Sequence, residues 1–351
     1  MIVDTKVCYD SHCHLSPDIT LDKFQEYVKP ILESQTWPIN IMMTNHIDEK
    51  MIIDAISNMG IISNRQIMLN VGIHPWFTHL YTFFNINDFK DLQDFKKFHY
   101  MNVLEIYSKS NIKTDEFNEI LEYLPIPISI YEIINKFKEI LINCKFPERI
   151  NIGEIGLDKL ARIPKSGFLG NPNFPLINGG GLSNYKIKMD HQVEIFKLQF
   201  ELALNTVNNN IPLPKKISIH CVGCHGLIFE ILKKFDSLKI KKDQIPAIVM
   251  HSYSGSVDNA KMLMKKLKNL HVWFGISDVI NLSKGNQEKF QQLINVIHDK
   301  ILVETDLGID RMLENHSDYI EEIVKKLIDL GVDEVTLLDN WRSFTQFETY
   351  V

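Results

Sequence analysis

Eight short apolar runs, rich in β-branched residues, constrain the fold of this chain more than any other feature. They lack the polar alternation of a half-exposed strand, so they predict parallel strands that are buried on both faces. The runs are Val7–Asp10, Ile39–Asn45, Gln66–Gly72, Ile150–Ile155, Lys216–His220, Ala247–His251, His271–Ile276 and Lys300–Thr305.

Helical patterns lie between these runs. Apolar residues recur every three or four positions in residues 21–32, 189–207 and 320–328, which predicts helices that pack one face on a core. Strands that alternate with helices are typical of an α/β fold with a parallel sheet. Eight such units within 351 residues predict one (β/α)8 TIM barrel, with residues 1–351 as a single domain.

Two stretches interrupt the alternation. Residues 77–127 are too long for one crossover, and residues 162–184 are rich in Gly, Pro and Asn. Each follows the end of a predicted strand, so on a barrel both are expected as long loop insertions on the catalytic face. They are either tolerated, partly disordered insertions or lids that shape access of the substrate.

Composition excludes several classes of protein. The chain is 45% hydrophobic and 23% charged, which is unlike a disordered chain, and it shows neither a secretory leader nor an apolar stretch long enough to cross a membrane. Five cysteines, an odd number, favour a reducing compartment, so we expect a cytoplasmic or nuclear protein. A net charge of −6 excludes nucleic-acid binding through a broad basic surface, although a nuclease that uses bound metal ions stays possible.

Titratable residues gather at the ends of the predicted strands, where barrel enzymes place their active sites. His12 and His14 lie two apart in extended chain, so both side chains point to one side. Four further strand ends carry the other candidate ligands, which are Glu154, His220, His251 and Asp306, and His74 lies at the end of one more strand. Mixed imidazole and carboxylate ligands suit two divalent ions that share a carboxylate, with zinc or manganese favoured and magnesium possible. Such a pair of ions is typical of a hydrolase.

The motifs as a set resemble the TatD family of metal-dependent deoxyribonucleases. The matching segments, in order, are DSHCHL at 10–15, GIHPW at 72–76, GEIGLD at 153–158, Ile219-His220, HSYSGS at 251–256 and ETD at 304–306. The segments Gln192–Ala203 and Val332–Phe344 are also similar to helices of that family.

The resemblance implies a role for each position. His12, His14 and Asp306 would hold one ion, His220 and His251 would hold the second, and Glu154 would bridge them. His74 would position a phosphate, and Asp306 would accept a proton from the attacking water. The implied substrate is DNA, most simply cut by a 3′–5′ exonuclease. A deep site at the mouth of a barrel admits a strand end more readily than the middle of a duplex, so we expect cleavage at ends or single strands, with no obligate protein partner.

Three departures from the family pattern weaken the substrate assignment more than the metal assignment. His220 is followed by Cys-Val-Gly where an arginine is usual, Asp306 is followed by Leu-Gly, and the position after the GEIGLD motif is Lys159. Phosphate contacts would then come from His74, Lys159 and the Ser254–Ser256 turn. Two other functions stay open: a metal-dependent hydrolase of a small ester, amide or lactone, and a non-enzymatic interaction protein.

The remaining candidates favour structural roles. Cys221 and Cys224 with His225 match a haem-attachment pattern, but we expect reduced, structural thiols there. His46 follows the second strand and could approach the cleft. The others are expected at the surface or satisfied in the core, namely His79, His99, His191, His271, His298 and His316.

Overall fold

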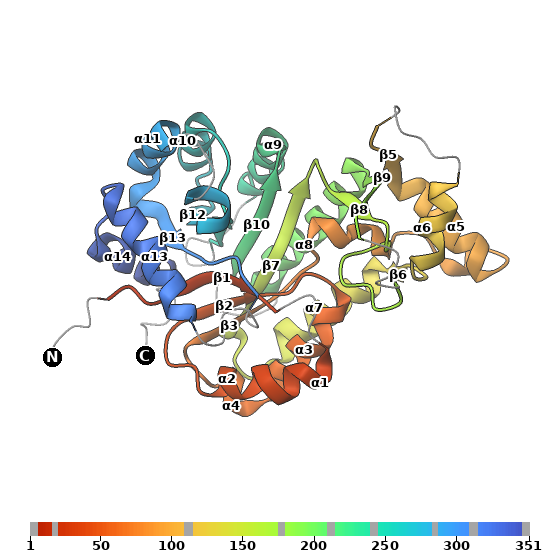
Figure 1. The fold of residues 1–351 in the computed structure, drawn as a ribbon, viewed down its shortest axis with the longest axis horizontal. Coiled ribbons are helices and arrows are strands. Elements are labelled where there is room, and N and C mark those ends of the chain that lie inside the picture. Colours follow the sequence, from red (N-terminus) through yellow and green to blue (C-terminus); the bar gives the residue numbers. More distant parts are fainter. Residues whose placement is uncertain are drawn as a thin grey trace.

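The computed structural model confirms the predicted eight-stranded parallel sheet. Its strands pair in chain order and form the centre of the molecule (Figure 1). They are β1 (Asp10–His14), β2 (Ile39–Met42), β3 (Ile67–Val71), β7 (Ile150–Asp158), β10 (Lys216–Val222), β11 (Ala247–Met250), β12 (His271–Ile276) and β13 (Ile301–Val303). The structure describes residues 6–15, 20–108, 115–174, 180–208, 215–238, 245–282, 287–308 and 315–345, with side chains at 205–208 and 287 left out.

The sheet closes into a barrel where the last strand meets the first. The His14 N–H donates to the Leu307 carbonyl at 2.9 Å, and the Asp306 N–H donates to the His12 carbonyl at 3.0 Å. These bonds lie just beyond the carboxyl end of β13, so closure brings Asp306 next to the two histidines of β1.

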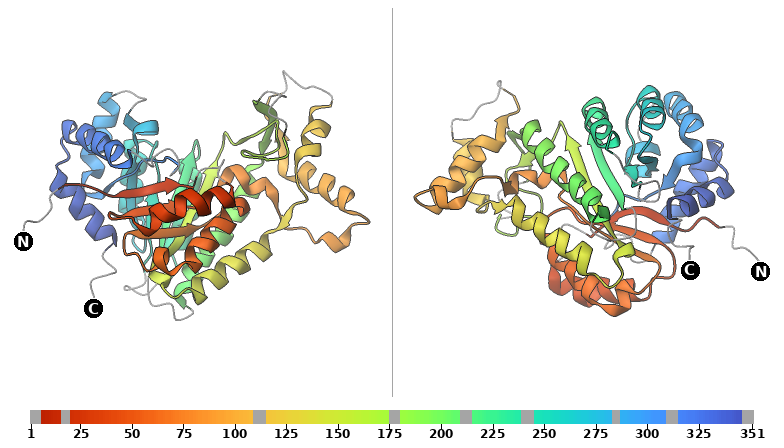
Figure 2. Two further views of the ribbon diagram at one scale, coloured as in Figure 1. Left: turned by 60° about the horizontal axis from the view of Figure 1, so that its bottom comes forward. Right: turned by 180° about the vertical axis from the view of Figure 1, so that it is seen from behind.

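Helices surround the strands, as Figures 1 and 2 show. The main ones are α1 (Leu21–Lys23), α2 (Lys29–Glu33), α3 (His46–Ser57), α4 (Met59–Ile62), α7 (Ile130–Asn143), α8 (Met189–Asn208), α9 (His225–Asp236), α10 (Val257–Lys266), α11 (Gln287–Ile297), α13 (His316–Asp329) and α14 (Glu334–Thr345). The 3-10 and π-helical turns are η1 (Phe24–Val28), η2 (Pro75–Leu80), η3 (Ile86–Asp88), η5 (Pro147–Arg149), η8 (Asp278–Leu282) and η9 (His298–Lys300). Within the described residues no helix is long and apolar enough to cross a membrane.

The three predicted helical stripes bury their apolar faces with few exceptions. Phe24, Phe200 and Leu327 are fully buried, whereas Ile328 at the end of α13 is 44% exposed. The side chain of Val207 lies outside the described residues. The stretch at 21–32 is a helix, but its middle turn is the π-helical η1.

The position predicted for the first strand was wrong. The strand is Asp10–His14 rather than Val7–Asp10, because its pairing with β2 begins at Asp10 opposite Ile39. The two histidines therefore lie within the strand and not after it. The fourth and fifth strands also extend past their predicted ends, since β7 and β10 stay paired as far as Asp158 and Val222.

The barrel interior is more polar than the apolar runs predict. Asn40 of β2 and Asn70 of β3 are buried, and the Asn70 side-chain amide donates to the Asn40 side-chain oxygen at 2.6 Å. Asn40 in turn donates to the Ser11 carbonyl at 3.0 Å. These amides are tolerated because each finds a partner inside the barrel.

The two insertions are more ordered than the loops that the sequence predicts. The first carries α5 (Leu92–Val103), β5 (Leu104–Ile106) and α6 (Glu116–Tyr123), and the second carries β8 (Arg162–Pro164) and the first half of β9 (Leu182–Ile187). β9 pairs antiparallel with both β5 and β8, so one small sheet joins the two insertions beside the barrel (Figure 1). A further parallel pair, β4 (Tyr81–Thr82) with β6 (Ile128–Ser129), joins the beginning and the end of the first insertion. Residues 109–114 and 175–179 lie outside the described residues.

Candidate metal centre and active site

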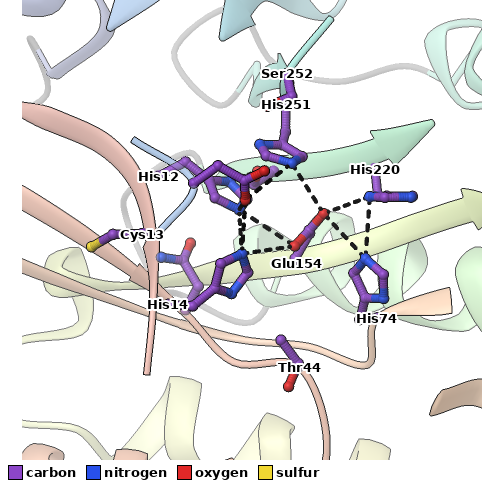
Figure 3. Close-up of polar contacts among 12 residues, drawn as sticks. His12, Cys13, His14, Thr44, His74, Glu154, His220, His251 and Ser252 are labelled. Carbon is purple, nitrogen blue, oxygen red and sulfur yellow. Dashed lines mark hydrogen bonds and ion pairs between the residues drawn. The ribbon is translucent and has the colours of Figure 1, made fainter. Parts of the chain in front are cut away.

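Six strands of the barrel bring the predicted site residues together at their carboxyl ends. Figure 3 shows the imidazoles arranged around Glu154, which lies in β7 and is almost fully buried. The contributing residues are His12 and His14 of β1, His74 after β3, Glu154 of β7, His220 of β10, His251 after β11 and Asp306 after β13. All of the predicted metal ligands are therefore within one cluster.

Glu154 is the centre of this cluster because each of its oxygens faces a different group of imidazoles. Oε2 lies 3.3 Å from His12 Nε2 and 3.4 Å from His14 Nε2. Oε1 lies 2.8 Å from His220 Nδ1 and 3.4 Å from His74 Nε2. A carboxylate in this position could bridge two cations.

Asp306 closes the side of the cluster nearest to solvent. Its Oδ1 lies 3.2 Å from His14 Nε2 and 3.6 Å from His251 Nε2, and its side chain is 19% exposed. The backbone at Asp306 is left-handed, with φ of 60°. Asp tolerates this conformation better than most residues do, because its short polar side chain can bond locally.

The inner ring nitrogens face one another at hydrogen-bond distance. His12 Nε2 and His14 Nε2 are 3.2 Å apart, and His74 Nε2 and His220 Nδ1 are 3.1 Å apart. Three sets of donor atoms lie close enough to share a cation: His12, His14 and Asp306; His12, Glu154 and His251; His74, Glu154 and His220. This donor set of imidazole and carboxylate fits zinc or manganese.

Contacts of the outer ring nitrogens indicate which imidazoles can act as ligands. His220 Nε2 lies 3.4 Å from Asp158 Oδ2, and His251 Nδ1 lies 3.0 Å from Glu304 Oε1. Carboxylates in these places favour a proton on the outer nitrogen, which leaves the inner lone pair for a cation, although the His251 pair is close without hydrogen-bond geometry. His12 Nδ1 lies 2.9 Å from Ser218 Oγ, which permits the same tautomer.

His74 has the opposite arrangement. Its Nδ1 accepts the backbone N–H of Trp76 at 3.1 Å, so the neutral ring carries its proton on Nε2, which faces the cluster. Burial lowers the pKa of His74 to about 4, so the ring is neutral near pH 7. The inner atom of His74 is therefore a hydrogen-bond donor, unlike the inner atoms of His220 and His251.

The carboxylates of the cluster are ionised. Burial alone would raise the pKa of Glu154, but His74, His251 and His12 hold it well below its usual range. Burial likewise opposes ionisation of Asp306, and His251 and His14 lower its pKa overall. Against the effect of burial, Asp158 and Glu154 raise the pKa of His220 to about 9. The ionised carboxylates therefore favour positive charge in the cluster, either on the imidazoles or on a bound cation.

Several supporting residues were not assigned from the sequence. Asp158, Glu304 and Ser218 hold the outer faces of the imidazoles, and Asp10 joins β1 to the last strand. Asp10 Oδ1 accepts the Thr305 N–H at 3.0 Å, and Asp10 Oδ2 lies 2.8 Å from His316 Nε2. The acidic residues in the DSHCH, GEIGLD and ETD segments could be recognised in the sequence. Their partners could not, because those partners are distant in sequence.

Two glutamines of α8 hold the backbone around the site. Gln199 Oε1 accepts the Ile73 N–H at 2.6 Å, one residue before His74. Gln192 Oε1 accepts the Asp158 N–H at 2.8 Å. The helix recognised by its family pattern therefore positions two segments of the active site.

A pocket of about 330 Å³ opens over the cluster. Its floor is the imidazole and carboxylate cluster, and its rim is apolar, with Leu15, Trp76, Phe77, Leu169 and Leu307. None of the described residues lining the pocket is Lys or Arg. Of the expected phosphate contacts, His74 lines the pocket, whereas Lys159 and residues 254–256 do not.

Most other sequence candidates have structural partners. Cys221 and Cys224 are buried thiols with sulfurs 3.9 Å apart, and Cys224 donates to the Leu157 carbonyl. Three histidines on the side of the insertions have Nε2 within hydrogen-bond distance of a backbone carbonyl, namely His79, His99 and His191. His46 packs against Tyr81 at the start of α3 rather than lining the pocket.

Comparisons with known proteins agree with this geometry. Residues 9–341 match the family model described as TatD related DNase. The chain is 31% identical over 254 residues to an uncharacterized deoxyribonuclease of Saccharomyces cerevisiae, covering 71% of this chain and 68% of that protein. It is 26% identical over 346 residues to the Cut9-interacting protein scn1 of Schizosaccharomyces pombe, and the alignment covers 92% of this chain and 90% of that protein.

Solved structures support the same fold. The TatD homologue YjjV of Escherichia coli aligns with a TM-score of 0.54 at 14% identity, covering 96% of both chains. An uncharacterized amidohydrolase of Saccharomyces cerevisiae aligns with a TM-score of 0.55 at 15% identity, and the alignment covers 97% of this chain and 99% of that chain. With a family match that spans the barrel from its first strand to its last helix, this chain belongs to the TatD-related deoxyribonuclease family.

Proposed function

We propose that this protein is a divalent-metal-dependent deoxyribonuclease that acts as a 3′–5′ exonuclease. The observation that carries the proposal is the orientation of the imidazoles around Glu154. At His220 and His251 the outer nitrogens face carboxylates, so the inner lone pairs converge with carboxylate oxygens on one small volume.

His12, His14 and Asp306 would hold one ion, which is the first of the three donor sets. His220 and His251 would hold the second, and Glu154 would bridge both because its two oxygens face the two groups. Zinc, manganese or magnesium would fill these sites, and the imidazole content favours the first two.

Two divalent ions held here would supply positive charge for a phosphate and a bound water of lowered pKa. These ions would supply a charge that no Lys or Arg among the described lining residues provides. Asp306 would accept the proton of the water, because it is ionised and is the carboxylate of the cluster nearest to solvent. His74 would donate from Nε2 to a phosphate oxygen, a role that suits its tautomer better than metal ligation does.

The size of the pocket supports attack at strand ends. A volume of about 330 Å³ is at the lower end of the range for small-ligand sites, so it suits one nucleotide rather than the middle of a duplex. We also propose that residues 1–351 form one domain. The odd number of cysteines supports a cytoplasmic or nuclear location.

Metal content tests the ligand assignment. The double variant His12→Ala/His14→Ala should lose at least one ion by elemental analysis while its circular dichroism stays native, because the apolar barrel residues are untouched. His271→Ala is a matched control, since His271 is exposed at the opposite end of β12. Full metal occupancy in the double variant would refute the assignment.

A metal-dependent hydrolase of a small ester, amide or lactone is the second candidate. One observation favours it, namely that Lys159 and residues 254–256 are outside the pocket lining. Activity on linear, single-stranded and closed circular DNA should be compared with a panel of carboxyl esters. Release of nucleotides from DNA ends supports the exonuclease, whereas rapid ester hydrolysis without nucleotide release supports the second candidate. Inactivity on both, despite bound metal, would favour an interaction protein.

A further inference from the structure

One aromatic side chain at the rim of the pocket is not used by the chemistry described above. Trp76 is 46% exposed and lines the pocket directly beside His74. The other tryptophans are more buried, including Trp273 at 4% and Trp341 at 9% exposure. An exposed aromatic ring at the rim of a functional pocket suggests a contact with a ligand.

The ring of Trp76 is held in place although it is exposed. Its indole N–H donates to Asp158 Oδ2 at 2.6 Å, and its ring meets the His74 ring edge-on with centroids 5.0 Å apart. Its backbone N–H donates to His74, and Pro75 before it restricts the turn η2. A ligand that stacks on this ring does not have to order it first, which preserves affinity.

The second insertion brings an apolar side chain to the same rim. Leu169 is 48% exposed and lines the pocket, while its neighbour Phe168 is buried and anchors the loop. The carbonyl of Gly167 is 2.9 Å from His79 Nε2, and Asn171 donates to the Tyr123 carbonyl at 2.9 Å. The insertion therefore presents Leu169 from a tethered loop.

The pocket thus combines an anion-binding floor, once cations are present, with a flat apolar rim. A nucleotide has the matching parts, because its phosphate carries the charge and its base has two apolar faces. On the basis of the proposed nuclease function, we propose that Trp76 stacks on the nucleobase at the strand end and that Leu169 contacts the same nucleotide. This contact would position the scissile phosphate over the cluster.

The described residues of the rim do not offer groups that distinguish bases. No Asn, Gln, Lys or Arg is among the described lining residues, and the hydroxyl of Thr44 is engaged with Asp48. Stacking is tolerant of sequence because every base has a π face. The contact should therefore hold all four bases, and purines more tightly than pyrimidines.

The test compares Trp76→Ala with Trp76→Phe on two oligonucleotides, one with a terminal base and one with an abasic tetrahydrofuran residue at the same position. Stacking of one base is worth about 1–3 kcal/mol, so Trp76→Ala should lose about 5- to 150-fold in kcat/KM on the base-bearing end. It should lose little on the abasic end, and Trp76→Phe should retain most of the activity on both. Leu169→Ala should show a smaller loss with the same selectivity.

Binding and metal content separate stacking from a structural effect. A phosphorothioate oligonucleotide that resists cleavage should quench the tryptophan fluorescence of the wild-type protein, and Trp76→Phe should abolish most of that quenching. Metal content should be unchanged in Trp76→Ala. The matched control is Tyr27→Ala, which removes another exposed aromatic ring that is not among the pocket-lining residues.

Two outcomes would overturn the inference while leaving the nuclease proposal intact. Equal losses on base-bearing and abasic ends would show that Trp76 acts through Asp158 and His220, and no loss on either would show that the ring makes no productive contact. A wild-type enzyme that releases no nucleotide from any DNA would instead refute the proposed function, and this inference with it.

Discussion

Replacing Asp306 with asparagine tests the proposed proton acceptor with little change in shape. The Asp306→Asn variant would keep the left-handed backbone, because asparagine also tolerates a φ near 60°. The N–H bond from this residue to the His12 carbonyl, which closes the barrel, would also be kept. The substitution therefore removes charge and basicity and leaves the closure of the barrel intact.

The expected loss follows from the position of the carboxylate. Asp306 Oδ1 lies 3.2 Å from His14 Nε2 and 3.6 Å from His251 Nε2, so asparagine would remove both a base and an anionic contact to the cluster. A positioned general base contributes about 100- to 10,000-fold. We expect kcat on single-stranded DNA to fall by at least about 100-fold, with a smaller change in KM.

Asp306→Ala separates the chemical effect from the structural one. Alanine has a steric cost of about 1–2 kcal/mol in the left-handed region, so this variant should melt a few degrees below Asp306→Asn while showing a similar loss of kcat. Metal content measured in parallel shows whether the base or the ion was lost. Unchanged turnover in Asp306→Asn would refute both proposed roles.

Three further predictions concern the orientation of His251, the pH dependence of stability and the salt dependence of DNA binding. Glu304→Gln weakens the contact that orients His251, so metal affinity should fall about 10- to 100-fold in a chelator competition titration. Burial lowers the pKa of His79 to about 4 and that of His99 to about 3. As the pH falls from about 6.5 towards 4, these two histidines therefore take up protons in the unfolded chain before they do so in the folded protein. The free energy of unfolding, measured with urea, should be lower at pH 5 than at pH 7.5 by about 2 kcal/mol for each histidine. Replacing both by glutamine should flatten this dependence, and an unchanged slope would contradict it. Affinity for single-stranded DNA should fall weakly with salt, with a log–log slope of about 0.7 to 1.4 for one or two phosphates, and a much steeper slope would indicate a wider groove.

The parallel barrel could be predicted because its information is local. Apolar runs and helical stripes reflect burial along single elements, and seven of the eight strands begin within one residue of their predicted starts. The candidate ligands were also visible, since polar residues stand out at the ends of apolar strands. His12 and His14 point to one site whether the strand ends before them or contains them, so the error in the first strand did not affect that conclusion.

The contacts that define the chemistry were decided by the tertiary structure. Closure between β1 and β13 sets Asp306 beside His14, nearly 300 residues away in the chain. The outer partners of His220 and His251 come from other strands or strand ends, and they determine which ring nitrogen faces the centre. The small sheet between the two insertions has the same origin, because residues with weak local preference became strands through pairing with each other. A single sequence reports what each segment buries, whereas the partner of a buried polar atom depends on how distant segments meet when the barrel closes.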